Sequence, residues 1–157
     1  MRRTLICAIA LLTACEQAIG LDEDYYVKPS VMRVASFTLI NADTDSPVEA
    51  HDPMGNNAEL DTESLGTQNL TLRANTSPQL VGSVIFDVDK TVSAHTENLF
   101  PYSLTEDGKG DYEPWQLGNG QHTVTGTPYD GKDGGGDAGI GLSITFTITG
   151  VDGGDGS

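Results

Sequence analysis

The segment Leu142-Ser-Ile-Thr-Phe-Thr-Ile-Thr149 alternates apolar and polar residues along its whole length. Because successive side chains of a strand point to opposite faces, this period of two predicts a strand with one buried and one solvated face. The same alternation recurs in residues 35–39, 70–74, 83–88 and 123–125. After the first fifteen residues, no segment keeps the 3.6-residue period of an amphipathic helix. We therefore expect an all-β fold with almost no helix.

Turn-forming residues separate these segments, as at Asp107-Gly108 and Gly118-Asn119-Gly120. About seven or eight short strands with such turns are typical of an antiparallel β-sandwich. The long acidic segment 41–66 has few apolar residues and is expected to hold one edge strand near 58–61. The positions expected to face the core are Ala35, Phe37, Leu39, Leu70, Leu72, Ala74, Val84, Phe86, Val88, Val124, Leu142, Ile144, Phe146 and Ile148.

Residues 1–14 join two arginines to a short apolar run, which is the pattern of a secretory signal peptide. The run is too short to cross a bilayer as a helix, which needs about 20 apolar residues. Leu12-Thr13-Ala14-Cys15 resembles the lipobox of bacterial lipoproteins. The resemblance implies cleavage between Ala14 and Cys15, acylation of Cys15 by chains such as palmitate, and export to the outer membrane or cell surface. The alternative is an ordinary cleaved signal peptide with a chance cysteine at its end.

This interpretation changes the composition of the mature chain. Cys7 leaves with the signal peptide and Cys15 carries lipid, so neither of the two cysteines can form a disulfide in the domain. Loss of Arg2 and Arg3 takes the formal charge from −15 to −17. So acidic a chain lacks the basic footprint that nucleic acids require, and no nucleic-acid partner is expected.

The organisation expected after the signal peptide has three parts. Residues 15–30 contain the lipidated cysteine and a short acidic tether, and residues 31–149 form the sandwich. Residues 150–157, which are almost entirely Gly and Asp, are expected to be a disordered tail.

The stretch from Gly82 to Ile148 is similar to the Ig-like modules of bacterial exported proteins. The resemblance is carried in order by segments 83–89, 91–97, 115–117, 120–125 and 142–149. In that family they correspond to strands C, C′, E, F and G. The resemblance implies an Ig-like sandwich and an exported protein, but no particular ligand, because such modules serve many functions.

Carboxylates are the most abundant candidates for chemistry. Asp130, Asp133 and Asp137 lie in one Gly-rich loop, and calcium takes six to eight oxygen ligands that flexible loops can supply. Calcium is therefore a possible ligand, with these three residues as the best site, although such loops also arise as plain soluble hairpins. Smaller acidic clusters occur at Asp43 and Asp45, and at Asp107, Asp111 and Glu113.

Other candidate residues favour structural roles. His122 occupies the position where Ig-like folds often place a tyrosine that bonds to the backbone, and we expect it to make such a bond. There is no G-x-S-x-G or H-E-x-x-H motif, so no catalytic residues are assigned and no enzyme is expected. Four aromatic residues are expected mainly to pack in the core, with sugar stacking as the alternative: Tyr102, Tyr112, Trp115 and Tyr129.

These features together predict a non-catalytic, lipid-anchored protein of the cell envelope. Its Ig-like module would serve surface binding or adhesion, or act as an accessory module. The membrane would be contacted through the lipid anchor, and the further partner would be a protein or a glycan. The alternative is a calcium-dependent carbohydrate-binding module, and a third possibility is an enzyme whose site carries no known motif.

Overall fold

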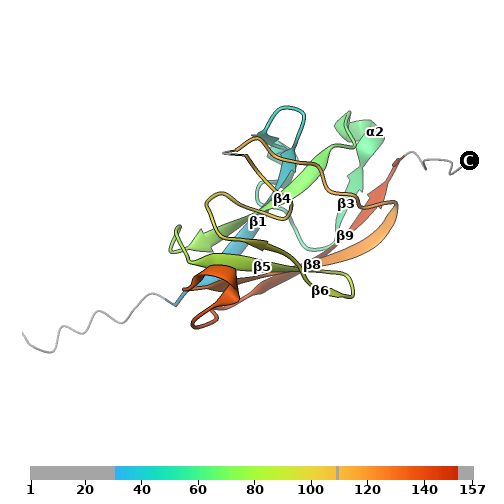
Figure 1. Cartoon of the computed structure of the whole chain (residues 1–157). Coiled ribbons are helices and arrows are strands. Elements are labelled where there is room, and N and C mark those ends of the chain that lie inside the picture. Colours follow the sequence, from blue (N-terminus) through green and yellow to red (C-terminus); the bar gives the residue numbers. More distant parts are fainter. Residues whose placement is uncertain (1–30, 109, 152–157) are drawn as a thin grey trace, which may run out of the picture.

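The computed structural model describes residues 31–108 and 110–151 (Figure 1). Two sheets of four and five strands pack as a sandwich, which confirms the predicted all-β fold. The first sheet has the order β2 (Ser46–Pro47), β1 (Arg33–Asn41), β4 (Leu70–Ser77) and β7 (Tyr102–Ser103). The second has the order β3 (Ala58–Asp61), β9 (Leu142–Thr149), β8 (Gly120–Tyr129), β5 (Ser83–Val88) and β6 (Thr91–Glu97).

Helix in the described chain is limited to three short turns, as the sequence predicts. They are the 3₁₀ turns η1 (Glu49–His51) and η2 (Lys132–Gly134) and the α-helical turn α2 (Thr62–Leu65). The predicted signal peptide, Cys15 and the tether lie outside the described residues, as do residues 152–157 of the predicted tail. Val151 exchanges two backbone hydrogen bonds with the Asn119 side chain, both of 2.8 Å.

The core lies between the two sheets and follows the alternation. Phe146 and Ile148 of β9 and Phe86 of β5 are buried, and they face Phe37 and Leu39 of the opposite sheet. The intervening threonines of β9 face outward, where Thr145 and Thr123 of β8 lie within hydrogen-bond distance across the strands. The second sheet therefore buries its apolar face and leaves the other face partly exposed. The first sheet departs from this pattern, because Thr38, Ile40 and Thr71, on the side away from the shared core, are fully buried as well.

The first strand departs from the predicted phase. The register between β1 and β4 shifts between Val34 and Ser36, so Val34 is buried and Ala35 is exposed. The prediction that Ala35 faces the core is thus wrong, because the irregularity inserts a residue and reverses the faces N-terminal to it. Two other predicted core residues, Val88 and Leu142, lie at strand ends and are half-buried.

The predicted edge strand forms as β3, at the predicted residues Ala58–Asp61. It pairs with β9 in parallel, from Ala58 opposite Phe146 to Asp61 opposite Thr149. The other strand pairs of the described chain are antiparallel. Periodicity predicts a strand but not its direction, so the parallel pairing is a tertiary result.

Residues Trp115–Leu117 do not form the predicted strand. Their neighbourhood has no regular structure, and a single backbone bond of 2.8 Å from the Trp115 N–H to the Leu70 carbonyl holds it to β4. Pro114 lacks an N–H and cannot contribute to a ladder at that point. The Trp115 ring instead stacks on Phe146, with centroids 5.5 Å apart and planes 6° from parallel.

The strand registers give the sandwich two distinct ends (Figure 1). Arg33 pairs with Ser77, Val84 with Glu97, and Tyr129 with Ala138. These pairs gather residues 31–33, 78–82, 98–101 and 130–141 at one end, which we call the entry end because the described chain begins there. The opposite end, which we call the acidic end, contains the described residues of segments 42–45, 61–69, 105–113 and 150–151.

Candidate functional site

The acidic end contains an open polar hollow of about 430 Å³. Three chain segments that are remote in sequence form it: the turn after β1, the loop around α2, and the end of β9. Its lining residues are Asp43, Thr62, Glu63, Gly66, Thr67, Gln68, Asn69 and Gly150. The hollow is therefore rich in the oxygen and amide groups that bind polar ligands.

The wall formed by α2 is built by local capping. The Asp61 carboxylate accepts a hydrogen bond from the Glu63 N–H at 3.2 Å and another from the Ser64 hydroxyl, which is the role of an N-cap. Gly66 ends the turn with φ of 71°, a conformation that glycine adopts without steric cost. The Thr62 hydroxyl donates to the Thr149 carbonyl at 3.1 Å and thereby ties the turn to β9.

Asp43 is the polar centre of this site. Its carboxylate accepts hydrogen bonds from the Thr67 hydroxyl at 2.5 Å and from the Asn69 amide at 2.7 Å. These two bonds hold the pKa of Asp43 below its ordinary value, and the bond from Thr67 has the larger effect. Asp43 is thus ionised at neutral pH and joins the turn after β1 to the α2 loop.

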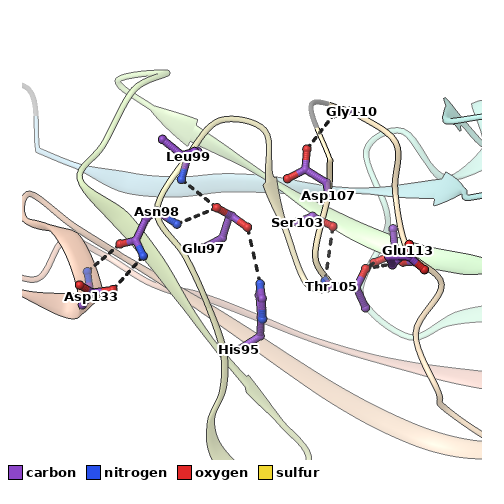
Figure 2. Close-up of polar contacts among 11 residues, drawn as sticks. His95, Glu97, Asn98, Leu99, Ser103, Thr105, Asp107, Gly110, Glu113 and Asp133 are labelled. Carbon is purple, nitrogen blue, oxygen red and sulfur yellow. Dashed lines mark hydrogen bonds and ion pairs between the residues drawn. The ribbon is translucent and has the colours of Figure 1, made fainter.

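The structure brings the two smaller acidic clusters of the sequence together. Asp45 Oδ1 accepts a hydrogen bond from the Tyr112 N–H at 2.9 Å, across 67 residues of chain. Within the second cluster, Asp107 Oδ2 accepts from the Gly110 N–H at 3.0 Å, and the Thr105 hydroxyl donates to the Glu113 carbonyl (Figure 2). The Asp45 and Asp107 carboxylates thus fix the loops while keeping negative charge at this end.

The loop of Asp130, Asp133 and Asp137 lies at the entry end, away from the hollow. Asp130 Oδ1 accepts from the Asp137 N–H at 2.8 Å, and Asp133 Oδ1 accepts from the Asn98 amide at 2.8 Å. Within residues 31–108 and 110–151, no three or more His, Cys, Asp or Glu side chains are grouped as a metal site would require. Calcium at Asp130, Asp133 and Asp137 remains a prediction.

His122 makes the expected bond to the backbone, since Nε2 lies 2.8 Å from the Gly118 carbonyl oxygen. Its Nδ1 lies 2.9 Å from Asp89 Oδ2, and the ring packs on Phe146 at 5.9 Å. Because both nitrogens face acceptors, both bonds form at once only when both nitrogens carry a proton. His122 is therefore placed as a structural clamp between the β5–β6 turn and the start of β8.

The Asp89 carboxylate provides a test of this clamp. Burial alone would raise the pKa of Asp89, but the hydrogen bonds from His122 and the Thr123 N–H, with the charge of His122, outweigh it and lower the pKa. A lowered carboxyl pKa stabilises the fold above the unfolded value, near 4, and this stability is lost as pH falls through the folded value. Because the side chain is 41% exposed, the contribution is expected to stay below about 1 kcal/mol.

Asp89→Asn is therefore expected to flatten the fall in melting temperature between pH 6 and pH 3, and to destabilise the protein at pH 6 but not at pH 3. Thermal melts followed by circular dichroism across this range would measure it. Asp111→Asn, which removes a charge from an exposed side chain, is the control. If both variants retain the wild-type slope, the clamp contributes no pH-dependent stability.

The aromatic residues favour core packing over sugar stacking. Tyr102, Tyr112 and Trp115 are buried, as expected, and Tyr129 is half-buried. The large exposed apolar residues include Leu99 and Phe100, which the alternation pattern does not identify. Their signal in the sequence is an apolar pair between two turn residues, Asn98 and Pro101.

Comparisons with protein-family models, with curated proteins and with solved structures found no match to this chain. No helix in the described part of the chain is long and apolar enough to span a membrane.

Proposed function

We propose that this chain is a non-catalytic, lipid-anchored binding protein of the bacterial cell envelope, whose Ig-like sandwich presents its acidic end to a partner. One observation carries the proposal: the described chain enters at one end of the sandwich, and the polar hollow lies at the opposite end. An anchor that precedes residue 31 would hold the entry end toward the membrane and direct the hollow away from it.

The anchor in this proposal is Cys15, within the lipobox-like segment Leu12–Cys15. Residues 16–30 separate it from the domain and can reach at most roughly 55 Å when fully extended. Stable attachment requires two or more acyl chains, because one chain binds a bilayer only weakly. This arrangement would keep the sandwich close to the membrane surface while its far end stays accessible.

The strand order supports the resemblance to Ig-like modules. The segments expected as strands C′, C, F and G correspond to β6, β5, β8 and β9, which lie side by side in one sheet in that order. Strands B, E and their neighbours occupy the opposite sheet in such folds. Here β7, and not the segment around Trp115, pairs with β4 in that sheet.

The charge of the acidic end indicates the class of partner. Eight carboxylate residues lie in its four segments: Asp43, Asp45, Asp61, Glu63, Glu106, Asp107, Asp111 and Glu113. A surface of one sign speeds association with a surface of the opposite sign and disfavours partners of like charge. The partner is therefore a protein with an exposed Lys- and Arg-rich surface, bound in a salt-dependent manner.

The test uses a photo-crosslinking amino acid at position 63 or 59 of the full chain, in the cells that produce it. Glu63 lines the hollow, whereas Glu59 is another exposed glutamate four residues earlier, on β3. Position 63 is expected to give a discrete crosslinked adduct in the membrane fraction, and position 59 is expected to give none. The adduct at position 63 is expected not to form when irradiation takes place at high salt.

Other results would contradict specific parts of the proposal. Equal adducts at both positions would exclude the hollow as the contact. A Cys15 without acyl chains in the mass spectrum of the membrane-bound protein would exclude the lipid anchor. A rise in melting temperature with millimolar calcium, together with glycan binding, would favour the calcium-dependent carbohydrate-binding alternative.

A further inference from the structure

The entry end carries an unusual concentration of exposed apolar side chains. Among the described residues, six large hydrophobic side chains are exposed, and Val92 is the one that lies elsewhere, beside the β5–β6 turn. The other five are Val31, Leu80, Leu99, Phe100 and Ile140. Leu80 is 69% exposed, Leu99 67% and Phe100 51%. Exposed apolar residues scattered singly are normal, but a group at one end indicates a contact surface.

The loops that carry Leu80 and Phe100 are tied together. The Tyr102 hydroxyl donates to the Val81 carbonyl at 2.7 Å and accepts from the Val81 N–H at 2.8 Å. The Phe100 ring meets the Tyr102 ring edge-on, with centroids 6.2 Å apart. These contacts set Leu80, Leu99 and Phe100 on two adjoining loops, and we call these three residues the apolar tip.

The loop of Leu99 is held in an outward conformation (Figure 2). Glu97 Oε1 accepts hydrogen bonds from the backbone N–H groups of Asn98 and Leu99, both at 2.8 Å, and Oε2 lies 3.6 Å from His95 Nε2. The Asn98 side chain exchanges two further bonds with Asp133 of η2. A loop fixed by this network keeps Leu99 and Phe100 at the surface without a further ordering cost upon binding.

The position of the chain entry indicates what covers the tip. Val31 and Ile140 flank the tip's end of the sandwich, and the Ile140 N–H bonds to the Met32 carbonyl at 2.8 Å. The anchor proposed at Cys15 reaches this end through residues 16–30 alone. The charges here are mixed: Arg33 and Lys132 accompany Asp130, Asp133 and Asp137. This composition fits a zwitterionic surface better than a strongly anionic one.

We propose that the apolar tip, Leu80, Leu99 and Phe100, inserts into the interface of the bilayer that holds the anchor. This proposal rests on the lipid anchor of the proposed function and adds a second, non-covalent attachment to it. The insertion sets the orientation of the sandwich and points the acidic end outward. Apolar side chains in the headgroup region strengthen attachment in proportion to the area they bury.

The experiment uses the full acylated chain reconstituted in phosphatidylethanolamine–phosphatidylcholine vesicles. Because acylated Cys15 is the single remaining cysteine of the expected mature chain, a cysteine placed at residue 80 or 92 can be labelled specifically with an environment-sensitive fluorophore. Leu80→Cys is expected to be strongly quenched by lipids with a spin label in the upper acyl chain. Val92→Cys, at a site that is 79% exposed and hence somewhat more accessible than Leu80, is the control and is expected to remain unquenched.

A second arm measures the affinity of the tip without the anchor. The Cys15→Ser chain is expected to bind the same vesicles weakly. Adding Leu80→Ser, Leu99→Ser and Phe100→Ser together to this chain is expected to lower its partition coefficient at least roughly tenfold. Two results would overturn the insertion of the tip and leave the anchor standing. One is a vesicle-bound chain whose probe at residue 80 is not quenched. The other is a probe at residue 80 that is already shielded from water in solution, without vesicles, because a second copy of the chain covers it. An unacylated Cys15 in the mass spectrum overturns the anchor, and the tip proposal with it.

Discussion

Phe37→Ala is expected to lower the free energy of unfolding by about 3–5 kcal/mol, the usual cost of removing a buried phenylalanine. The ring is fully buried in β1 and lies 6.5 Å from the Phe86 ring of the opposite sheet. It also rests against the bare Cα of Gly126, where a Cβ would stand 3.1 Å from it. Because protein interiors are closely packed and relax only in part around a cavity, most of the lost contacts are not recovered.

Equilibrium urea unfolding of the full chain would measure this loss. Phe100→Ala is the matched control, since it makes the same substitution at a half-exposed ring of the entry end and is expected to cost less than about 1 kcal/mol. Comparable losses in the two variants would mean that Phe37 does not lie in the centre of the core.

Trp115→Ala is expected to destabilise the protein by a comparable amount, about 3–5 kcal/mol. The indole is almost completely buried and stacks on Phe146, and this stack with one backbone bond holds a segment that has no strand ladder. Removal of the ring would both open a cavity and free residues around it. Trp115→Phe retains a stacking ring and is expected to lose much less.

Thermal melts by circular dichroism would measure these variants, because the chain has one tryptophan and the substitutions remove its fluorescence. The result also separates two interpretations of Trp115. A stable Trp115→Ala chain that no longer binds a glycan would show that the ring is a sugar platform. A melting temperature of Trp115→Ala well below that of Trp115→Phe would support a role of the ring in the core.

Much of the fold was predictable because strand formation is encoded locally. The alternation in residues 142–149 and 83–88 sets which face is apolar, and burial of that face requires a second sheet. The short edge strand predicted near 58–61 forms at Ala58–Asp61. The face of the sheet on which Ala35 lies was not predictable, because a register shift depends on the partner strand and leaves no mark in a period-two pattern.

The candidate site was less predictable, since its residues come from separate segments. Asp43 was one of several acidic candidates, and nothing local indicates that Thr67 and Asn69 would bind its carboxylate. Conversely, Asp130, Asp133 and Asp137 are close in sequence, yet their described bonds fasten a loop at the other end of the sandwich. Proximity in sequence is a weak guide to a ligand site, because side-chain direction depends on loop conformation.

The sequence by itself determined that this chain is acidic, that it forms short strands with one apolar face each, and that residues 31–151 contain no cysteine and so no internal disulfide. These properties follow from composition and from the two-residue period, which act over a few residues. The tertiary structure alone decided that β3 runs parallel to β9, that Trp115 packs without a strand, and that Asp43 and Leu80 lie at opposite ends. Those outcomes depend on contacts between segments tens of residues apart, whose geometry is set only when the two sheets close on a shared core.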